Sequence, residues 1–199
     1  MKKNLAFLLI SISLISCSGK KGENLPPAAG ISGDMYLVMD SLQWKGPLGK
    51  LLDSTFNAEM RGLPRTEYIY NMHWVDPRKL NFILKQRRNL IFATTLDKRS
   101  YGAGIVKQIF TADFVQKIKT DPTLYVTTSK NVFAKGQEVM YLYGNNEQEL
   151  MANIRKNHQQ LVDHFDKTER DRLTKSLLKS GQLKGLSDWI KKNMQADMK

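Results

Sequence analysis

Between residues 35 and 95 the apolar positions alternate between the spacing of a strand and the spacing of a helix. Short apolar runs or period-two alternation predict three strands: residues 35–40 (MYLVMD), 67–75 (EYIYNMHWV) and 89–96 (NLIFATTL). One helix is predicted to begin at Pro47, which suits a first helical turn, and a second at the cap Asp76, which precedes a proline. This segment therefore predicts a β-α-β-α-β unit.

The pattern after residue 100 is less regular. Ser100–Gly104 predicts a turn, Ile105–Phe110 a strand, and Ala112–Lys119 a short helix. The β-branched and aromatic segments 124–129 (LYVTTS) and 138–144 (EVMYLYG) predict two more strands.

From Asn146 onward the spacing of apolar residues is helical. One side of a long predicted helix carries Leu150, Ile154, Leu161, Phe165, Leu173 and Leu177. Thr168 and Asp171 have the spacing of a capping box, so the helix could restart there. A last amphipathic helix is predicted between Leu183 and Met194.

Strands that alternate with helices and are followed by a helical end predict the α/β (α+β) class. The expected architecture is a two-layer sandwich: a mixed β-sheet with helices on one side and a helical C-terminal segment. We expect the α/β domain over residues 34–145 and the helical segment, packed on that domain, over residues 146–199.

The first seventeen residues have the features of an exported lipoprotein. Two lysines precede Leu5–Ile15, a mostly apolar run that is shorter than the roughly 20 residues needed to span a hydrocarbon core. Residues 1–16 resemble a signal peptide, and the end of the run, Leu14-Ile15-Ser16-Cys17, resembles a bacterial lipobox. We expect Cys17 to carry lipid, because a thiolate is a strong nucleophile toward a lipid donor. The alternatives are an uncleaved signal and a buried core cysteine.

The composition indicates a basic chain with a flexible tether. The formal charge is +12, and it is +10 without residues 1–16. This charge suits binding to anionic envelope polymers. Nucleic acid is not an expected partner of an exported lipoprotein. The basic residues are dispersed, so the alternative is a solvated surface. Residues 17–33 are rich in Gly, Ser, Lys and Pro and predict a flexible tether. Cys17 is the only cysteine, so the fold must rely on its hydrophobic core and not on a disulfide.

Several segments together carry a family resemblance. They are the lipobox with its tether, YLVMDSLQWKGPLGKLL from Tyr36, GLPRTEYIY from Gly62, RRNLIFATTLDK from Arg87 and VFAKGQEVMYLYGNNEQEL from Val132. In this order they resemble an uncharacterised family of Bacteroidetes envelope lipoproteins, described only as a domain of unknown function. Members of that family continue with a second α/β half, so the resemblance implies that this chain corresponds to the N-terminal half. Arg65 stands where the family tends to have glutamine.

The candidate binding residues are Asp40, Trp44, Arg88 and Asn89. Asp40 ends the first predicted strand, whereas Arg88 and Asn89 begin the third. Loops at the carboxyl ends of strands often hold ligands in α/β sheets. The four residues share one edge of the sheet only if these two strands are antiparallel. The alternative role is an ion pair that fixes a loop.

No residue pattern predicts a catalytic site, a metal site or a cofactor. His158 and His164 are six residues apart on the predicted helix, whereas a helical metal pair needs a spacing of three or four. His73 is more simply explained as a structural histidine. Gly102 and Gly104 lack the third glycine of a dinucleotide-binding loop and are expected in a turn.

These observations favour a membrane-anchored envelope lipoprotein that acts as a non-enzymatic binding or assembly component. We expect it at the outer membrane, facing the periplasm. Its expected partners are the bilayer, through acylated Cys17, and other envelope proteins or anionic envelope polymers. The alternative is a hydrolase acting on envelope glycan or lipid. That alternative gains support if Asp40, Arg88 and Asn89 converge in one pocket with a histidine.

Overall fold

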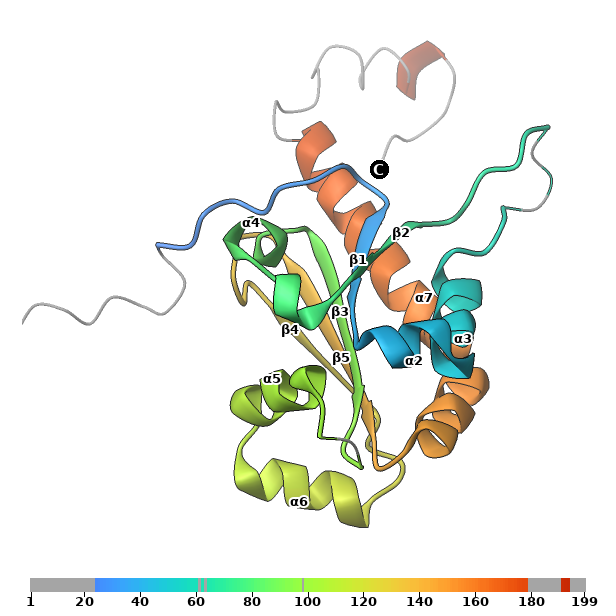
Figure 1. Ribbon diagram of the computed structural model, residues 1–199. Coiled ribbons are helices and arrows are strands. Elements are labelled where there is room, and N and C mark those ends of the chain that lie inside the picture. Colours follow the sequence, from blue (N-terminus) through green and yellow to red (C-terminus); the bar gives the residue numbers. More distant parts are fainter. Residues whose placement is uncertain (1–23, 61, 63, 98, 179–190, 194–199) are drawn as a thin grey trace, which may run out of the picture.

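The computed structural model describes residues 24–178, except 61, 63 and 98, together with residues 191–193 (Figure 1). The predicted signal peptide, Cys17 and the first part of the predicted tether lie outside the described residues. So does most of the helix predicted between Leu183 and Met194.

The core of the fold is a five-stranded mixed sheet with the order β2-β1-β3-β5-β4. Its strands are β1 (Asp34–Val38), β2 (Asn71–Val75), β3 (Asn89–Thr95), β4 (Val126–Lys130) and β5 (Glu138–Gly144). The strands β2, β1, β3 and β5 are mutually parallel, and β4 runs antiparallel to β5 at the edge. Every residue of β3 and of β5 is buried, as the nearly continuous apolar runs in these strands require. The α/β class and the mixed sheet predicted from the sequence are confirmed.

The helices connect the strands and close the sheet (Figure 1). They are α2 (Ser41–Lys45), α3 (Pro47–Phe56), the 3-10 helix η1 (Pro77–Lys79), α4 (Phe82–Lys85), α5 (Tyr101–Ile109), α6 (Ala112–Thr120) and α7 (Glu147–Leu177). The two predicted helix starts are confirmed: Pro47 is at the start of α3, and the Asp76 side chain accepts the backbone N–H of Arg78.

Helices cover both faces of the sheet. On one face, Leu37 and Ile91 pack in a core with side chains of α3 and α7. On the other face, Val38 and Phe92 pack in a second core with side chains of α4, α5 and α6. The expected two-layer sandwich with helices on one side is therefore corrected to three layers. The physical reason is that a parallel strand with apolar side chains on both faces must be covered on both.

Helix α5 covers part of the face that holds the second core. The sequence predicted a turn there, followed by a strand at Ile105–Phe110. That prediction was wrong. Glycine lowers helix propensity, and α5 contains both Gly102 and Gly104. Tertiary packing outweighs this cost, because Ala103 is fully buried and Ile105 packs in the second core.

The long helix after Asn146 is confirmed as α7, and the Asn146 side chain caps it by accepting the N–H of Glu149 at 2.9 Å. The predicted restart at Thr168 is wrong, since the Thr168 hydroxyl donates to the carbonyl of His164 inside a continuous helix. The one departure from helical backbone lies at Asn157, with φ −119° and ψ 19°.

Phe165 is the aromatic side chain through which α7 enters the first core. It is fully buried and makes edge contacts with Phe56 and Tyr70. We expect Phe165→Ala to lower the free energy of unfolding by about 3–5 kcal/mol, because it leaves a cavity between α3, α7 and the sheet. Urea unfolding measures this change. Leu173→Ala, on the same helix but 59% exposed, should change it by less than about 0.5 kcal/mol. Equal effects of the two substitutions would contradict the assigned packing of α7.

Candidate functional site

The carboxyl edge of the sheet is the first place where a ligand site is expected. Because β1, β2 and β3 are parallel, the residues that follow them lie along one edge. The chain leaves β1 toward β2 on one side and later returns to β3 on the other side. The order of strands therefore reverses between β1 and β3, and crevices at such positions hold ligands in many α/β proteins.

Asp40 lies at this position and faces the first turn of α5. Its Oδ1 accepts the backbone N–H of Gly102 at 3.4 Å. Its Oδ2 is buried and has no hydrogen-bond partner among the described residues. A β-carbon at residue 102 would lie 2.7 Å from Oδ2, so the carboxylate fills the space that a larger residue would need. A negative charge at the amino end of a helix is favoured by the exposed N–H groups and the helix dipole.

Buried polar groups surround Asp40. Extending the β1–β3 register by two residues places Thr94 opposite Asp40, and the hydroxyl of Thr94 is also buried without a partner among the described residues. On the other face, the Gln43 amide donates to Thr95 at 3.0 Å and to Glu147 at 3.3 Å. This layer ties α2 and the start of α7 to the end of β3.

Trp44 and Asp76 complete the carboxyl edge. The Trp44 ring stacks on Trp74, with 6.3 Å between ring centroids, and Trp74 donates its indole N–H to the carbonyl of Met39. Asp76 forms a two-pronged ion pair with Arg78, and these bonds lower the pKa of Asp76 to about 2. Trp44 is thus part of the packing that joins α2 to the edge strand β2.

The amino edge of the sheet carries a second and denser polar network. Asn89 is fully buried and donates its amide to the carbonyl of Asp34 and to Glu169, while its oxygen accepts from Arg172 at 2.7 Å. Arg172 also donates to Glu169 and to the carbonyl of Arg88. These bonds connect the amino end of β3 to the last third of α7.

Ionisable side chains in this network have shifted pKa values. Burial raises the pKa of Glu169, but hydrogen bonds from Asn89, Ser32 and Arg172 outweigh burial, so the net pKa is lowered. Burial and a 2.5 Å bond to Asp166 raise the pKa of Tyr70. Each of these groups therefore keeps, at neutral pH, the protonation state that its partners require.

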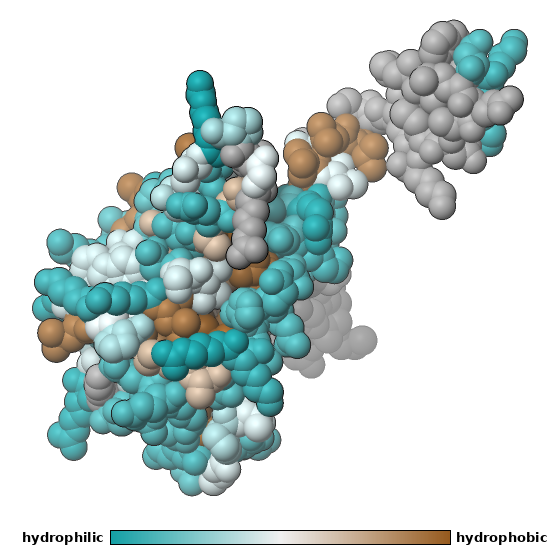
Figure 2. Space-filling model, turned by 90° about the vertical axis from the view of Figure 1, so that its right-hand side faces the viewer, coloured by the Kyte–Doolittle hydropathy of each residue, from teal (hydrophilic) through white to brown (hydrophobic). Residues whose placement is uncertain are grey.

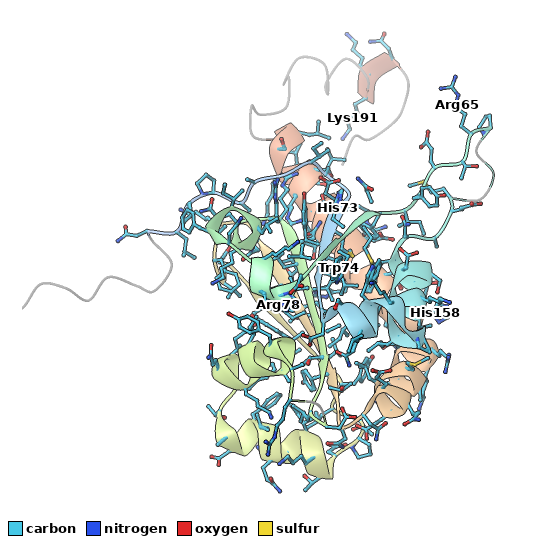
Figure 3. All side chains as sticks on the ribbon, in the orientation of Figure 1. Arg65, His73, Trp74, Arg78, His158 and Lys191 are labelled. Atoms are coloured by element: carbon cyan, nitrogen blue, oxygen red, sulfur yellow. The ribbon has the colours of Figure 1, made fainter. Side chains whose placement is uncertain are left out.

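One histidine lies on β2 and two lie on α7, and each has its own partner. His73 on β2 stacks on Tyr36 and lies 3.4 Å from Asp34. His158 contacts the backbone carbonyl of Arg155, and His164 contacts Glu138 at 2.8 Å. His73 and His158 are well separated in Figure 3. Among the described residues, no three side chains of the His, Cys, Asp or Glu type are grouped as metal ligands would be.

The structure does not bring the four candidate residues together. Since β1 and β3 are parallel, with Tyr36 opposite Leu90, Asp40 and Trp44 lie at the carboxyl edge while Arg88 and Asn89 lie at the amino edge. No histidine joins either pair. Arg65 lies on the arm formed by residues 57–70, which projects away from the sheet (Figure 3).

Sequence reasoning missed Gln43, Glu169 and Arg172, and it placed Gly102 in a turn and not at the start of a helix. Glu169 and Arg172 have the i,i+3 spacing of a helical ion pair, which was available as a signal. Their burial was not available, because it arises only when α7 packs against the amino end of β3.

A family model described as "Domain of unknown function (DUF8532)" matches residues 28–178. The matched region begins two residues after Pro26, where the chain first bonds to the amino edge of the sheet, and ends one residue after α7. No curated protein and no solved structure matches the chain.

The contact between Asp40 and α5 predicts coupled effects on stability. Gly102→Ala should lower the free energy of unfolding by about 1–3 kcal/mol, because its β-carbon collides with the Asp40 carboxylate. In an Asp40→Ala background the same substitution should be neutral or stabilising, since alanine favours a helix. Thermal or urea unfolding of the four proteins measures the coupling. Gly104→Ala, where the space is open, is the matched control and should stabilise by about 0.5–1 kcal/mol. Additive effects at residues 40 and 102 would refute the contact.

The lowered pKa of Glu169 predicts a pH-dependent contribution to stability. A carboxyl group with a depressed pKa stabilises the fold above its unfolded pKa, about 4.3 for glutamate, and this stabilisation is lost as the pH falls through the folded value. Glu169→Gln should therefore cost about 1.5–3 kcal/mol at neutral pH, and the difference from the parent should shrink in acid. Urea unfolding across this range measures it. Glu67→Gln, at an exposed carboxylate of the arm, is the control. A difference that stays constant with pH would contradict the role assigned to Glu169.

Proposed function

The chain belongs to the DUF8532 family, whose description names no activity, and we propose from its own residues that it is a lipid-anchored, non-enzymatic binding or assembly component of a bacterial cell envelope. The observation that carries the proposal is the sequence Leu14-Ile15-Ser16-Cys17 at the end of an apolar run. The resemblance to Bacteroidetes envelope lipoproteins supports the same address. The absence of an acidic run after Cys17 favours an outer-membrane position facing the periplasm.

The way the tether meets the sheet is compatible with such an anchor. Eight residues separate Cys17 from Pro26. From Pro26 the chain is bonded to the amino edge: Pro26 accepts the N–H of Lys135 at 2.7 Å, and Ala29 accepts the N–H of Arg88 at 3.1 Å. A lipid on Cys17 would therefore hold the amino edge of the sheet within about 30 Å of the bilayer surface.

Attachment through the polypeptide itself has no support in the described part of the chain. None of the helices there is both long and apolar enough to cross a membrane.

A binding role is supported by surface features and not by a reactive centre. The arm of residues 57–70 projects from the body, is closed by backbone bonds between Met60 and Glu67 and between Ala58 and Ile69, and exposes Met60 and Tyr68. The face drawn in Figure 2 is mostly hydrophilic, with hydrophobic side chains gathered in its middle and toward the end of α7. Contiguous apolar patches with a polar rim mark protein contact surfaces, and Met60 and Tyr68 place two exposed apolar side chains on one projecting segment.

The hydrolase alternative receives no such support. It requires a nucleophile, acid or base to converge on one reacting bond. Asp40 contacts α5, Asn89 and Arg172 bind one another, and each histidine has its own structural partner. The described geometry therefore favours binding over hydrolysis.

Lipid attachment at Cys17 is directly testable. Cells that express the chain and are fed labelled palmitate should label the parent protein, and Cys17→Ser should abolish the label because no other thiol is present. Ser18→Ala, next to the cysteine, is the control and should keep the label. Labelling that survives in Cys17→Ser would overturn the proposed anchor.

A further inference from the structure

A pocket of about 280 Å³ opens at the amino edge of the sheet, between the β4–β5 loop and the last turns of α7. Four of its lining residues are basic: Lys130, Lys135, Arg172 and Lys175. We call this pocket the basic pocket. It lies at the opposite end of the sheet from Asp40.

The three lysines of the basic pocket carry positive charge that the described structure does not neutralise. Lys130, Lys135 and Lys175 are exposed, and none has an ion pair among the described residues. The acidic residues of the same pocket have other partners: Glu138 contacts His164, and Asp171 pairs with Lys167. Arg172 is matched by Glu169. The net result is an excess of free ammonium groups around one concave site.

The backbone that presents these lysines is held firmly. In the β4–β5 loop, Asn131 donates its N–H to the carbonyl of Gln137 and accepts the N–H of Gly136 through its side chain. The Gln137 amide in turn donates to the carbonyls of Lys85 and Arg87 at 2.6 and 2.7 Å. Lys175 follows Arg172 by three residues on α7, and Arg172 is fixed by Asn89. Lysine positions fixed in this way lose less conformational freedom when they bind an anion.

The basic pocket lies beside the segment that leads to Cys17. Lys135 donates its N–H to Pro26 and accepts the N–H of Ala28, so a residue of the pocket is bonded directly to the tether. The length of the tether keeps the pocket within about 30 Å of an anchored cysteine. Charges interact with a membrane surface over about one Debye length, close to 10 Å. The tether therefore allows the pocket to come within this distance of the bilayer.

We propose that the basic pocket binds the phosphate group of anionic phospholipids in the membrane that anchors the chain, so that the amino edge of the sheet rests on the bilayer. The orientation rests on the proposed lipid anchor, whereas the binding chemistry does not. Lysine ammonium groups are compact charges that bind phosphate, and each basic residue near an anionic bilayer strengthens association about fivefold. The carboxyl edge would then remain accessible to partners.

The test uses the chain without residues 1–17, which keeps every described residue and cannot be lipidated at Cys17. Its sedimentation with vesicles is measured for phosphatidylcholine alone and for phosphatidylcholine mixed with phosphatidylglycerol. The parent should prefer the anionic vesicles, and high salt should weaken the preference. The triple variant Lys130→Gln, Lys135→Gln, Lys175→Gln should reduce binding to anionic vesicles by about tenfold or more. All three positions are exposed, so unfolding curves should match the parent.

A matched variant separates the pocket from overall charge. The control lysines are exposed and lie on α2 and α6 near the carboxyl edge: Lys45, Lys117 and Lys119. The position of α6 follows from Asn145, just after β5, which donates to the carbonyls of Ile118 and Lys119. Their replacement by glutamine removes the same charge and should change binding by no more than about twofold. Equal losses in the two triple variants, or no preference of the parent for anionic vesicles, would overturn the proposal.

Three further outcomes identify the source of the phosphate and the anchor. If inorganic phosphate binds the pocket but vesicles do not, the assignment to lipid is wrong. If the pocket variant loses vesicle binding while Cys17→Ser keeps its palmitate label, the anchor fails and the pocket remains a headgroup site. If Cys17 is lipidated but the pocket variant binds vesicles like the parent, the anchor stands and the pocket proposal fails.

Discussion

The parallel pairing of β1 with β3 is the constraint on which the rest of the molecule depends. It places the ends of the strands so that Asp40 lies at one edge of the sheet and Asn89 at the other. It requires helical connections that cross the sheet, and it buries β3 on both faces, so helices must cover each side. The two edges then acquire different chemistry. Helix starts and capping groups meet at the carboxyl edge, whereas the tether and the end of α7 meet at the amino edge.

The amino-edge network shows how a polar group can hold a helix in place. Asn89, at the start of an otherwise apolar strand, is fully buried, and all of its hydrogen-bonding groups are matched by Asp34, Glu169 and Arg172. A buried amide without partners would cost about 1–3 kcal/mol, so this arrangement is stable only when α7 lies in register with β3. The apolar contacts of Phe165 hold α7 against the sheet, and the network determines its position along the sheet.

The same edge concentrates unneutralised positive charge next to the tether, and this gives the domain a preferred side. A chain held by lipid near its amino edge would turn its basic pocket to the bilayer and leave its carboxyl edge exposed. In such an arrangement the buried contacts of Glu169 and Glu138 have a further effect. They withdraw Glu138 and Glu169 from the surface, while the exposed Asp171 pairs with Lys167, so the three lysines of the pocket have no ion pair among the described residues.

The sequence by itself determined the local structure where the apolar period was strong. The β-α-β-α-β unit, the strand at residues 138–144 and the long helix after Asn146 follow from apolar spacing and from the helix starts at Pro47 and Asp76, because these act between near neighbours in the chain. The helix at Tyr101–Ile109 did not follow, since its glycines weaken the local signal and its stability comes from burial of Ala103 and close approach to Asp40. Whether Asp40 and Asn89 share a site, whether helices cover one face or two, and which lysines remain unpaired were decided by the tertiary structure alone. Strand direction and the packing of α7 bring together residues that can be more than a hundred positions apart in the sequence. No short-range pattern predicts which of these residues will be in contact.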